Sequence, residues 1–131
     1  MTDGLVLEVV VPWVPPVRMS LNRKPPPRSW RRWNQDGKRA AILAIRDQVR
    51  GNGGVPETGD LAIAYEVRWP RGRQEWDSDN LKMCFKGIRD AFELEGVIAN
   101  DRLIRRDQVE QSWGEGPGEI VVSLWRLEAR A

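Results

Sequence analysis

The chain has 131 residues, of which 40% are hydrophobic and 31% charged, and its formal net charge is +2. This is the composition of one ordinary globular domain, so we treat residues 1–131 as a single domain. The sequence has no histidine and one cysteine, Cys84, which excludes an intramolecular disulfide, a Cys/His zinc site and histidine-based nucleophilic catalysis. An enzyme with this composition works through carboxylates, lysines, hydroxyls or an oxygen-bound metal ion.

The chain begins with a predicted strand followed by a long loop. Residues 5–11 are rich in valine and leucine, which is typical of a largely buried strand. Prolines recur from Pro12 to Pro27, and such a segment forms neither a helix nor an inner strand. We therefore expect a loop over residues 12–27, and a loop of this length is usually functional or disordered.

A run of basic residues with no acidic residue among them begins in this loop and extends beyond it. We call residues 18–32 the basic segment, and its bases are Arg18, Arg23, Lys24, Arg28, Arg31 and Arg32. Trp30 lies within it, and cations between aromatic rings suit phosphate backbones with exposed bases. The alternative is a solvated, loosely ordered loop. Residues 1–50 carry a net charge of +6 and residues 51–131 a net charge of −4, so the near-neutral total hides an asymmetry.

Residues 35–49 predict a helix, because their apolar residues recur at helical spacing. Residues 61–69 alternate strictly between apolar and polar residues, which predicts a strand with one packed face. Residues 70–73 break this strand and form a second basic loop with Arg71 and Arg73.

A second helix is predicted over residues 80–95, with Asp77 or Asp79 as its N-terminal cap and Gly96 at its end.

Two further strands are predicted over residues 103–109 and 119–127, with the glycine-rich residues 114–118 as a hairpin turn between them. The order strand, helix, strand, helix, strand, strand predicts an α+β domain, in which two main helices pack on a mixed β-sheet of about four strands. We expect Trp69 and Trp125 in its core.

Asp77 and Asp79 stand two residues apart where the second helix begins. Carboxylates this close repel each other unless a cation neutralises them, and hard divalent cations prefer oxygen ligands. Asp101 follows the second helix and joins this pair only if the next strand packs alongside. Three carboxylates from two loops would form a Mg²⁺ site, whereas the alternative is that Asp79 only caps the helix. Lys82 lies in the first helical turn, where a cation opposes the helix dipole unless an anion is near.

Together these pieces resemble the RusA-type Holliday junction resolvases. The matching residues are Asp77-Ser78-Asp79-Asn80-Leu81, Lys86, Arg89-Asp90-Ala91-Phe92 and Gly96-Val97-Ile98-Ala99-Asn100-Asp101. Ser20-Leu21-Asn22, which follows Pro15-Pro16, is similar to the proline-rich loop of that family. The resemblance covers roughly residues 5–127.

The resemblance implies a small, usually dimeric endonuclease that depends on Mg²⁺, with Mn²⁺ as a substitute. Such an enzyme resolves four-way DNA junctions in recombination and repair by phosphodiester hydrolysis. Asp77, Asp79 and Asp101 match the metal-binding aspartates, and Lys86 matches the lysine that meets the scissile phosphate. Two further positions are Asp90, an acid on the helix, and Asn100, which stands where the family usually has an aspartate.

We expect the DNA contacts to come from the two basic loops and the polar and aromatic residues beside them. These candidates are Arg18, Asn22, Arg23, Lys24, Arg28, Trp30, Arg31, Arg32, Arg71, Arg73, Trp76 and Lys82.

Two other functions stay open: a non-catalytic nucleic-acid-binding module whose acids only cap helices, and a nuclease for other branched DNA. Dependence on Mg²⁺ separates the first from an enzyme. A glycosyltransferase is least favoured, because it needs a larger nucleotide-binding domain. The sequence shows no signal peptide and no apolar run near the roughly 20 residues of a membrane span. We therefore expect a cytoplasmic protein of a bacterium, or one encoded by a phage.

Overall fold

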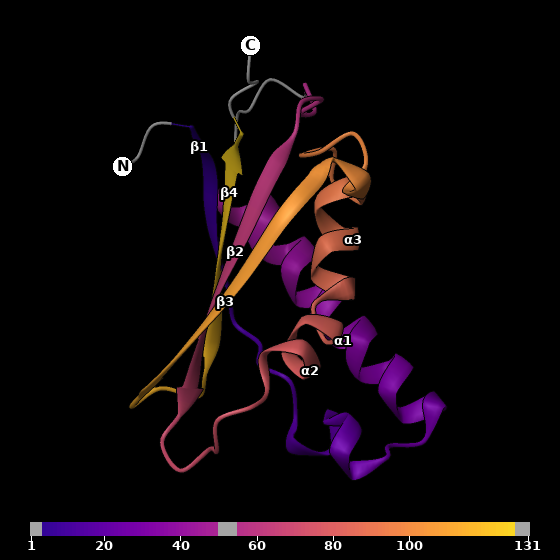
Figure 1. Ribbon diagram of the computed structural model, residues 1–131, viewed down its shortest axis with the longest axis vertical. Coiled ribbons are helices and arrows are strands. Elements are labelled where there is room, and N and C mark those ends of the chain that lie inside the picture. Colours follow the sequence, from indigo (N-terminus) through magenta and orange to yellow (C-terminus); the bar gives the residue numbers. More distant parts are fainter. Residues whose placement is uncertain (1–3, 50–54, 128–131) are drawn as a thin grey trace.

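Four strands form one mixed sheet, and the helices cover one of its two faces (Figure 1). The computed structural model describes residues 4–49 and 55–127. The strands are β1 (Leu5–Val11), β2 (Leu61–Pro70), β3 (Ile104–Gly114) and β4 (Glu119–Arg126). Their order across the sheet is β1-β4-β2-β3, with β2 and β3 parallel and both other pairs antiparallel. The α+β class and the mixed four-stranded sheet are confirmed.

The alternation along β2 places every second side chain in the core. Leu61, Ile63, Tyr65, Val67 and Trp69 are all buried, and they face the helices. The residues between them lie on the other face of the sheet, which explains the period of two in the sequence.

Three α-helices connect the strands. They are α1 (Pro27–Gln48), α2 (Ser78–Met83) and α3 (Lys86–Leu94), and three short 3₁₀ turns are η1 (Val17–Met19), η2 (Leu21–Arg23) and η3 (Asp101–Leu103). Gly96 follows α3 with a φ of 73°, the left-handed conformation that ends a helix, as predicted. No helix in the described part of the chain is long and apolar enough to cross a membrane.

The first helix begins at Pro27 and not near Gln35, so the second half of the basic segment is helical. Proline is favoured in the first turn of a helix, because the amide hydrogen that it lacks would have no partner there. The loop over residues 12–26 is confirmed in part, since η1 and η2 lie within it. Arg28, Arg31 and Arg32 therefore project from the start of α1 and not from a loop.

The helix predicted over residues 80–95 is divided at Cys84 and Phe85. The amide of Cys84 donates to the carbonyl oxygen of Leu81 (2.8 Å), so the last turn of α2 tightens to the 3₁₀ type. Phe85 is then buried and stacks on Tyr65 with 4.1 Å between the ring centroids. Burial of this ring sets the start of α3, a tertiary effect that helical periodicity does not contain.

Two further predictions about the sheet are wrong. The strands β3 and β4 do not form a hairpin, because β2 lies between them and pairs with both. Trp69 is buried as predicted, but Trp125 is only half-buried and pairs with Ala62 on the face without helices. Residues 114–118 thus connect β3 to β4 across the edge of β2, which lies between them.

Helices α1 and α3 pack closely at Gly87. The amide of Gly87 donates to Asn34 Oδ1 on α1 (3.0 Å). A Cβ atom at this position would overlap the carbonyl oxygen of Asn34 and would lie 3.0 Å from the Cβ of Lys38. This contact holds the start of α3, and with it Lys86, against the helix that carries half of the basic segment.

Candidate functional site

Asp77 and Asp79 lie at the start of α2, after the loop that follows β2. Asp77 is the N-cap residue but makes no capping hydrogen bond with its side chain, and Asp79 is in the first turn. Both residues are exposed, and neither side chain is paired with a cation in the part of the chain that the structure describes. The two carboxylates are thus open to solvent, and their place at the mouth of the helix agrees with the prediction.

Gln111 on β3 holds the segment directly before these acids. Its Nε2 donates to the carbonyl oxygen of Trp76 (2.8 Å), and its Oε1 accepts from the amide of Trp76 (3.0 Å) and from Nε1 of Trp69 (2.9 Å). The two indole rings lie 5.4 Å apart. The direction from which Asp77 leaves the sheet is therefore set by a side-chain amide that no sequence pattern marked.

Asn80 joins the start of α2 to the loop that contains η1 and η2. It is buried, its Nδ2 donates to Ser20 Oγ (2.8 Å), and its Oδ1 accepts from the amide of Leu21 (3.2 Å). The two segments that carry the family resemblance, residues 20–22 and 77–81, thus contact each other although about sixty positions separate them.

The Asn80→Ala variant should be less stable than the wild type by about 2 kcal/mol, because two part-buried polar groups, the Ser20 hydroxyl and the Leu21 amide, lose their partner. Urea unfolding measures this difference, and Ser78→Ala, an exposed position in the same helix, is the control. Equal stability of Asn80→Ala and wild type would mean that the contact between the segments contributes nothing.

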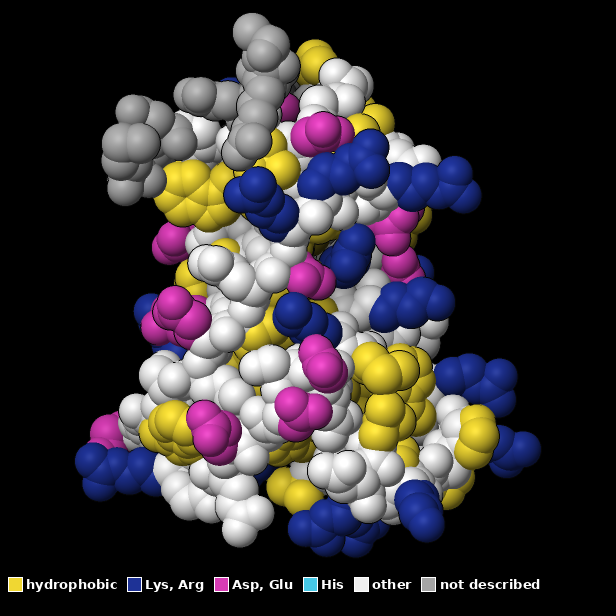
Figure 2. Space-filling model, in the orientation of Figure 1, with side chains coloured by type: hydrophobic (Ala, Val, Ile, Leu, Met, Phe, Trp, Pro, Cys, Tyr) yellow, Lys and Arg dark blue, Asp and Glu magenta, His cyan; other side chains and the backbone are white. Residues whose placement is uncertain are grey.

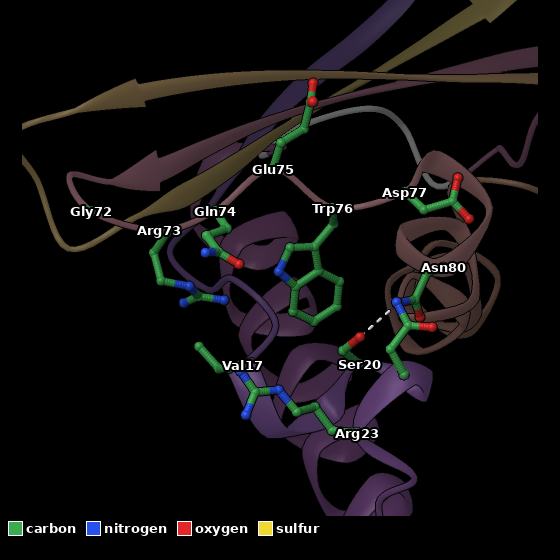
Figure 3. A pocket seen from close by; sticks show the side chains of 11 residues that line it. Val17, Ser20, Arg23, Gly72, Arg73, Gln74, Glu75, Trp76, Asp77 and Asn80 are labelled. Atoms are coloured by element: carbon green, nitrogen blue, oxygen red, sulfur yellow. Dashed lines mark hydrogen bonds between the residues drawn. The ribbon is translucent and has the colours of Figure 1, made fainter.

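A groove of about 430 Å³ runs beside Asp77 (Figure 3). One wall comes from the η1–η2 region with Arg23, and the other from the loop after β2. Trp76 points into the space between them, with Arg73 on one side and Asn80 on the other. The full lining is Val17, Ser20, Asn22, Arg23, Gly72, Arg73, Gln74, Glu75, Trp76, Asp77 and Asn80. The groove therefore brings together cations, amides and an indole next to a carboxylate.

Arg73 is built into the wall of this groove. Its guanidinium lies 4.4 Å from the ring centroid of Trp69, and its Nη2 donates to the carbonyl oxygen of Pro15 (2.7 Å). Burial lowers the pKa of Arg73 from its ordinary value. Arg71 lies in the turn after β2 and pairs with Glu115. Arg71 and Arg73 are both predicted DNA contacts, and Arg73 in addition anchors the loop after β2 to residues 12–16.

The bases of the basic segment are exposed. Figure 2 shows many Lys and Arg side chains at the lower right, around the start of α1. None of the segment's bases is paired with an acid among residues 4–49 and 55–127, and Asn22 is exposed beside them. Trp30 is half-buried, and its Nε1 has no hydrogen-bond partner within the described chain. A cationic surface therefore adjoins the groove, as predicted from the sequence.

The three charged residues predicted on the second helix differ in their surroundings. Lys82 Nζ pairs with Asp107 Oδ1 on β3 (3.1 Å), whereas Lys86 is exposed at the start of α3. Lys86 and Asp90 form no ion pair with each other or with any other described residue.

Asp101 lies beside α3. Its carbonyl oxygen accepts from Arg89 Nη2 (3.3 Å), and the residue is half-buried at the start of η3. Asn100 caps η3, because its Oδ1 accepts from the amide of Arg102 (2.8 Å). An aspartate at position 100 could cap η3 in the same way.

The donor set fits a metal ion in part. Asp77 and Asp79 form an open pair of carboxylates, and Mg²⁺ is commonly held by one or two carboxylates together with water and phosphate oxygens. Across residues 4–49 and 55–127, however, no three acidic or cysteine side chains lie close enough together to hold a metal ion. The site with three carboxylates that includes Asp101 stays a prediction.

No protein-family model matches the chain, and no curated protein matches its sequence. The function of the protein is therefore inferred from the residues of this chain. Sequence reasoning missed Gln111, Asp107 and Tyr65, which are single residues on strands; their partners are set by the register of the sheet and not by a local pattern.

Proposed function

We propose that the protein is a Mg²⁺-dependent endonuclease that cuts branched DNA, with four-way junctions as its substrate. It acts as a homodimer, because two equivalent strands of a junction suit two equivalent subunits. We place it in the cytoplasm, where it meets DNA. The observation that carries the proposal is the place of the Asp77–Asp79 pair, which opens beside a groove whose other wall belongs to the basic segment.

The groove and the cations support binding to DNA. Exposed arginines attract phosphates, and the indole of Trp76 offers a surface on which an unpaired base can stack. At a branch point the continuous stacking of base pairs is interrupted, so an aromatic ring can reach a base there, whereas the bases of a linear duplex are stacked on both sides. Arg23, Asn22 and Gln74 line the same groove and can contact the sugar-phosphate chain or a base edge.

The carboxylates support hydrolysis. A divalent cation held by Asp77 and Asp79 supplies an activated water and neutralises charge on the phosphate. Lys86 is exposed at the start of α3, where its ammonium group can approach the same phosphate. By the family resemblance we also assign Asp101 to the reaction, although it follows the far end of α3 from Asp79 and forms no cluster with the other two acids among the described residues.

The experiment that tests the proposal is incubation of the purified protein with a four-way junction and with a linear duplex of matched sequence, with and without Mg²⁺. We expect paired nicks in the junction only when Mg²⁺ is present. Binding without any cut under all conditions would instead identify a non-catalytic nucleic-acid-binding module. Equal cutting of flaps, forks and junctions would identify a nuclease with a broader preference.

Replacement of Arg28, Arg31 and Arg32 by glutamine should weaken junction binding and flatten its salt dependence. Each lost phosphate contact lowers the slope of log Kobs against log [salt] by about 0.9, so the slope should fall by up to about 3. Titrations in EDTA at several salt concentrations measure it. The control replaces Arg105, Arg106 and Arg126, which removes the same charge from strands β3 and β4. Equal slopes for the two variants would show that only net charge matters.

A further inference from the structure

Among the described residues, Lys82 is the one lysine that forms an ion pair. Its Nζ lies 3.1 Å from Asp107 Oδ1, and about a third of each side chain is exposed (35% and 33%). The ion pair connects α2 with the edge strand β3. The other ion pairs of the described residues all use arginine, so this contact is distinct in its chemistry.

The pair lies close to the acids at the start of α2. Residues three positions apart on an α-helix are neighbours on its surface, so Lys82 shares a side of α2 with Asp79. In Figure 2 acidic and basic side chains alternate down the middle of the molecule, where α2 lies beside β3. The ammonium group of Lys82 is thus held within reach of any phosphate that approaches Asp79.

Tyr65 lies one register step from Asp107 in the paired strands β2 and β3. Asp107 is the register partner of Ile63, and Tyr65 follows Ile63 on the same, helix-covered face of β2. Tyr65 is 2% exposed, and its hydroxyl has no hydrogen-bond partner in the described part of the chain. A buried donor without an acceptor is unfavourable and rare.

The charges around Tyr65 keep its hydroxyl a donor. Burial raises the pKa of Tyr65 far above its ordinary value, the charge of Arg89 lowers it, and the charge of Asp107 raises it further. The guanidinium of Arg89 is itself engaged with the carbonyl oxygen of Asp101. Asp107 is therefore the acid whose charge acts on this hydroxyl, while its own ion-pair partner is Lys82.

We propose that Asp107 is a positioning residue with two alternative partners. It holds the Lys82 ammonium group beside Asp79 in the free protein, and it accepts the hydroxyl of Tyr65 once Lys82 moves onto a phosphate group of DNA. The inference rests on the proposed function and adds to it how Lys82, beside Lys86 a second cation for the phosphates, is held and released. The exchange gives the buried hydroxyl of Tyr65 an acceptor and keeps Asp107 partnered when Lys82 leaves.

The chain contains one tyrosine, so a ¹³Cζ tyrosine label gives a single NMR signal that reports on this hydroxyl. We expect the signal to shift when a four-way junction is added in EDTA. In the Lys82→Met variant the shifted signal should be present without DNA, because Asp107 is already released, and the junction should change it little. In Asp107→Asn the junction should cause at most a small shift.

Asp60→Asn is the matched control, since Asp60 pairs with Arg105 (3.2 Å) away from Tyr65. The tyrosine signal of this variant should shift when the junction binds, as the signal of the wild type does. An identical tyrosine signal in the wild type and in Lys82→Met would overturn the exchange. A Lys82→Met shift without any junction-induced shift in the wild type would overturn its link to DNA. The label also separates this inference from the proposed function, because the signal would respond to the junction even if Mg²⁺ produced no cleavage.

Discussion

Asp79→Asn should reduce Mg²⁺-dependent cleavage of a four-way junction by about a hundredfold or more. Loss of groups that only support a metal ligand already costs 10- to 100-fold, and a direct ligand contributes at least as much. Asparagine keeps the shape of the side chain and its place in the first turn of α2, so the fold is retained. Junction binding should stay as tight or become tighter, because one negative charge near the phosphates is removed.

Single-turnover cleavage with Mg²⁺ and gel-shift titration in EDTA measure these two effects separately. The control is Asp36→Asn, which removes the same charge from an exposed position on α1 and should cut as the wild type does. Cleavage by Asp79→Asn at the wild-type rate would remove this carboxylate from the reaction. Equal loss in both variants would show that the effect comes from net charge and not from the site.

Gly87→Ala should destabilise the fold by about 3 kcal/mol, the upper part of the range for an overfilled contact. The added methyl group would overlap the backbone oxygen of Asn34, which cannot move away as a flexible side chain can. To relieve the overlap, α1 and α3 must separate, and the hydrogen bond from Gly87 to Asn34 Oδ1 is lost with it. Urea unfolding followed by circular dichroism measures the difference.

Gly116→Ala is the control for this change, because the added carbon meets nothing within 4 Å. Its stability should stay within about 0.5 kcal/mol of the wild type. A Gly87→Ala protein as stable as Gly116→Ala would mean that the two helices adjust without cost. The position of Lys86, one residue before Gly87, would then not depend on this contact.

The parts of the fold that follow from local patterns could be predicted. The period of two from Leu61 to Trp69 and the left-handed Gly96 depend on neighbouring residues only. The division at Cys84 and Phe85 could not be predicted, because it depends on the stacking of Phe85 on a strand twenty positions away. The failed hairpin has a similar cause: the glycine-rich turn permits a reversal, but the insertion of β2 between β3 and β4 is decided by packing.

The candidate site divides in the same way. Asp77, Asp79 and the exposed bases of the basic segment lie where the sequence places them, since charge runs and helix starts are local features. The contact between Asn80 and Ser20 could not be predicted, because no rule of spacing connects the two segments. Asp107 was missed because a single acid on a strand has no pattern until the register pairs it with Ile63 and the fold brings it to Lys82.

The central place of β4 has a consequence for synthesis of the protein. This strand, the last in the chain order, lies between β1 and β2 and pairs with both. While residues 119–126 are still in the ribosome, β1 has no strand to pair with, and the arginine-bearing residues that follow it cannot dock against Arg73 and Asn80. Contacts so distant in sequence form late and slowly. The groove therefore does not exist on a nascent chain until residues 119–126 have left the ribosome.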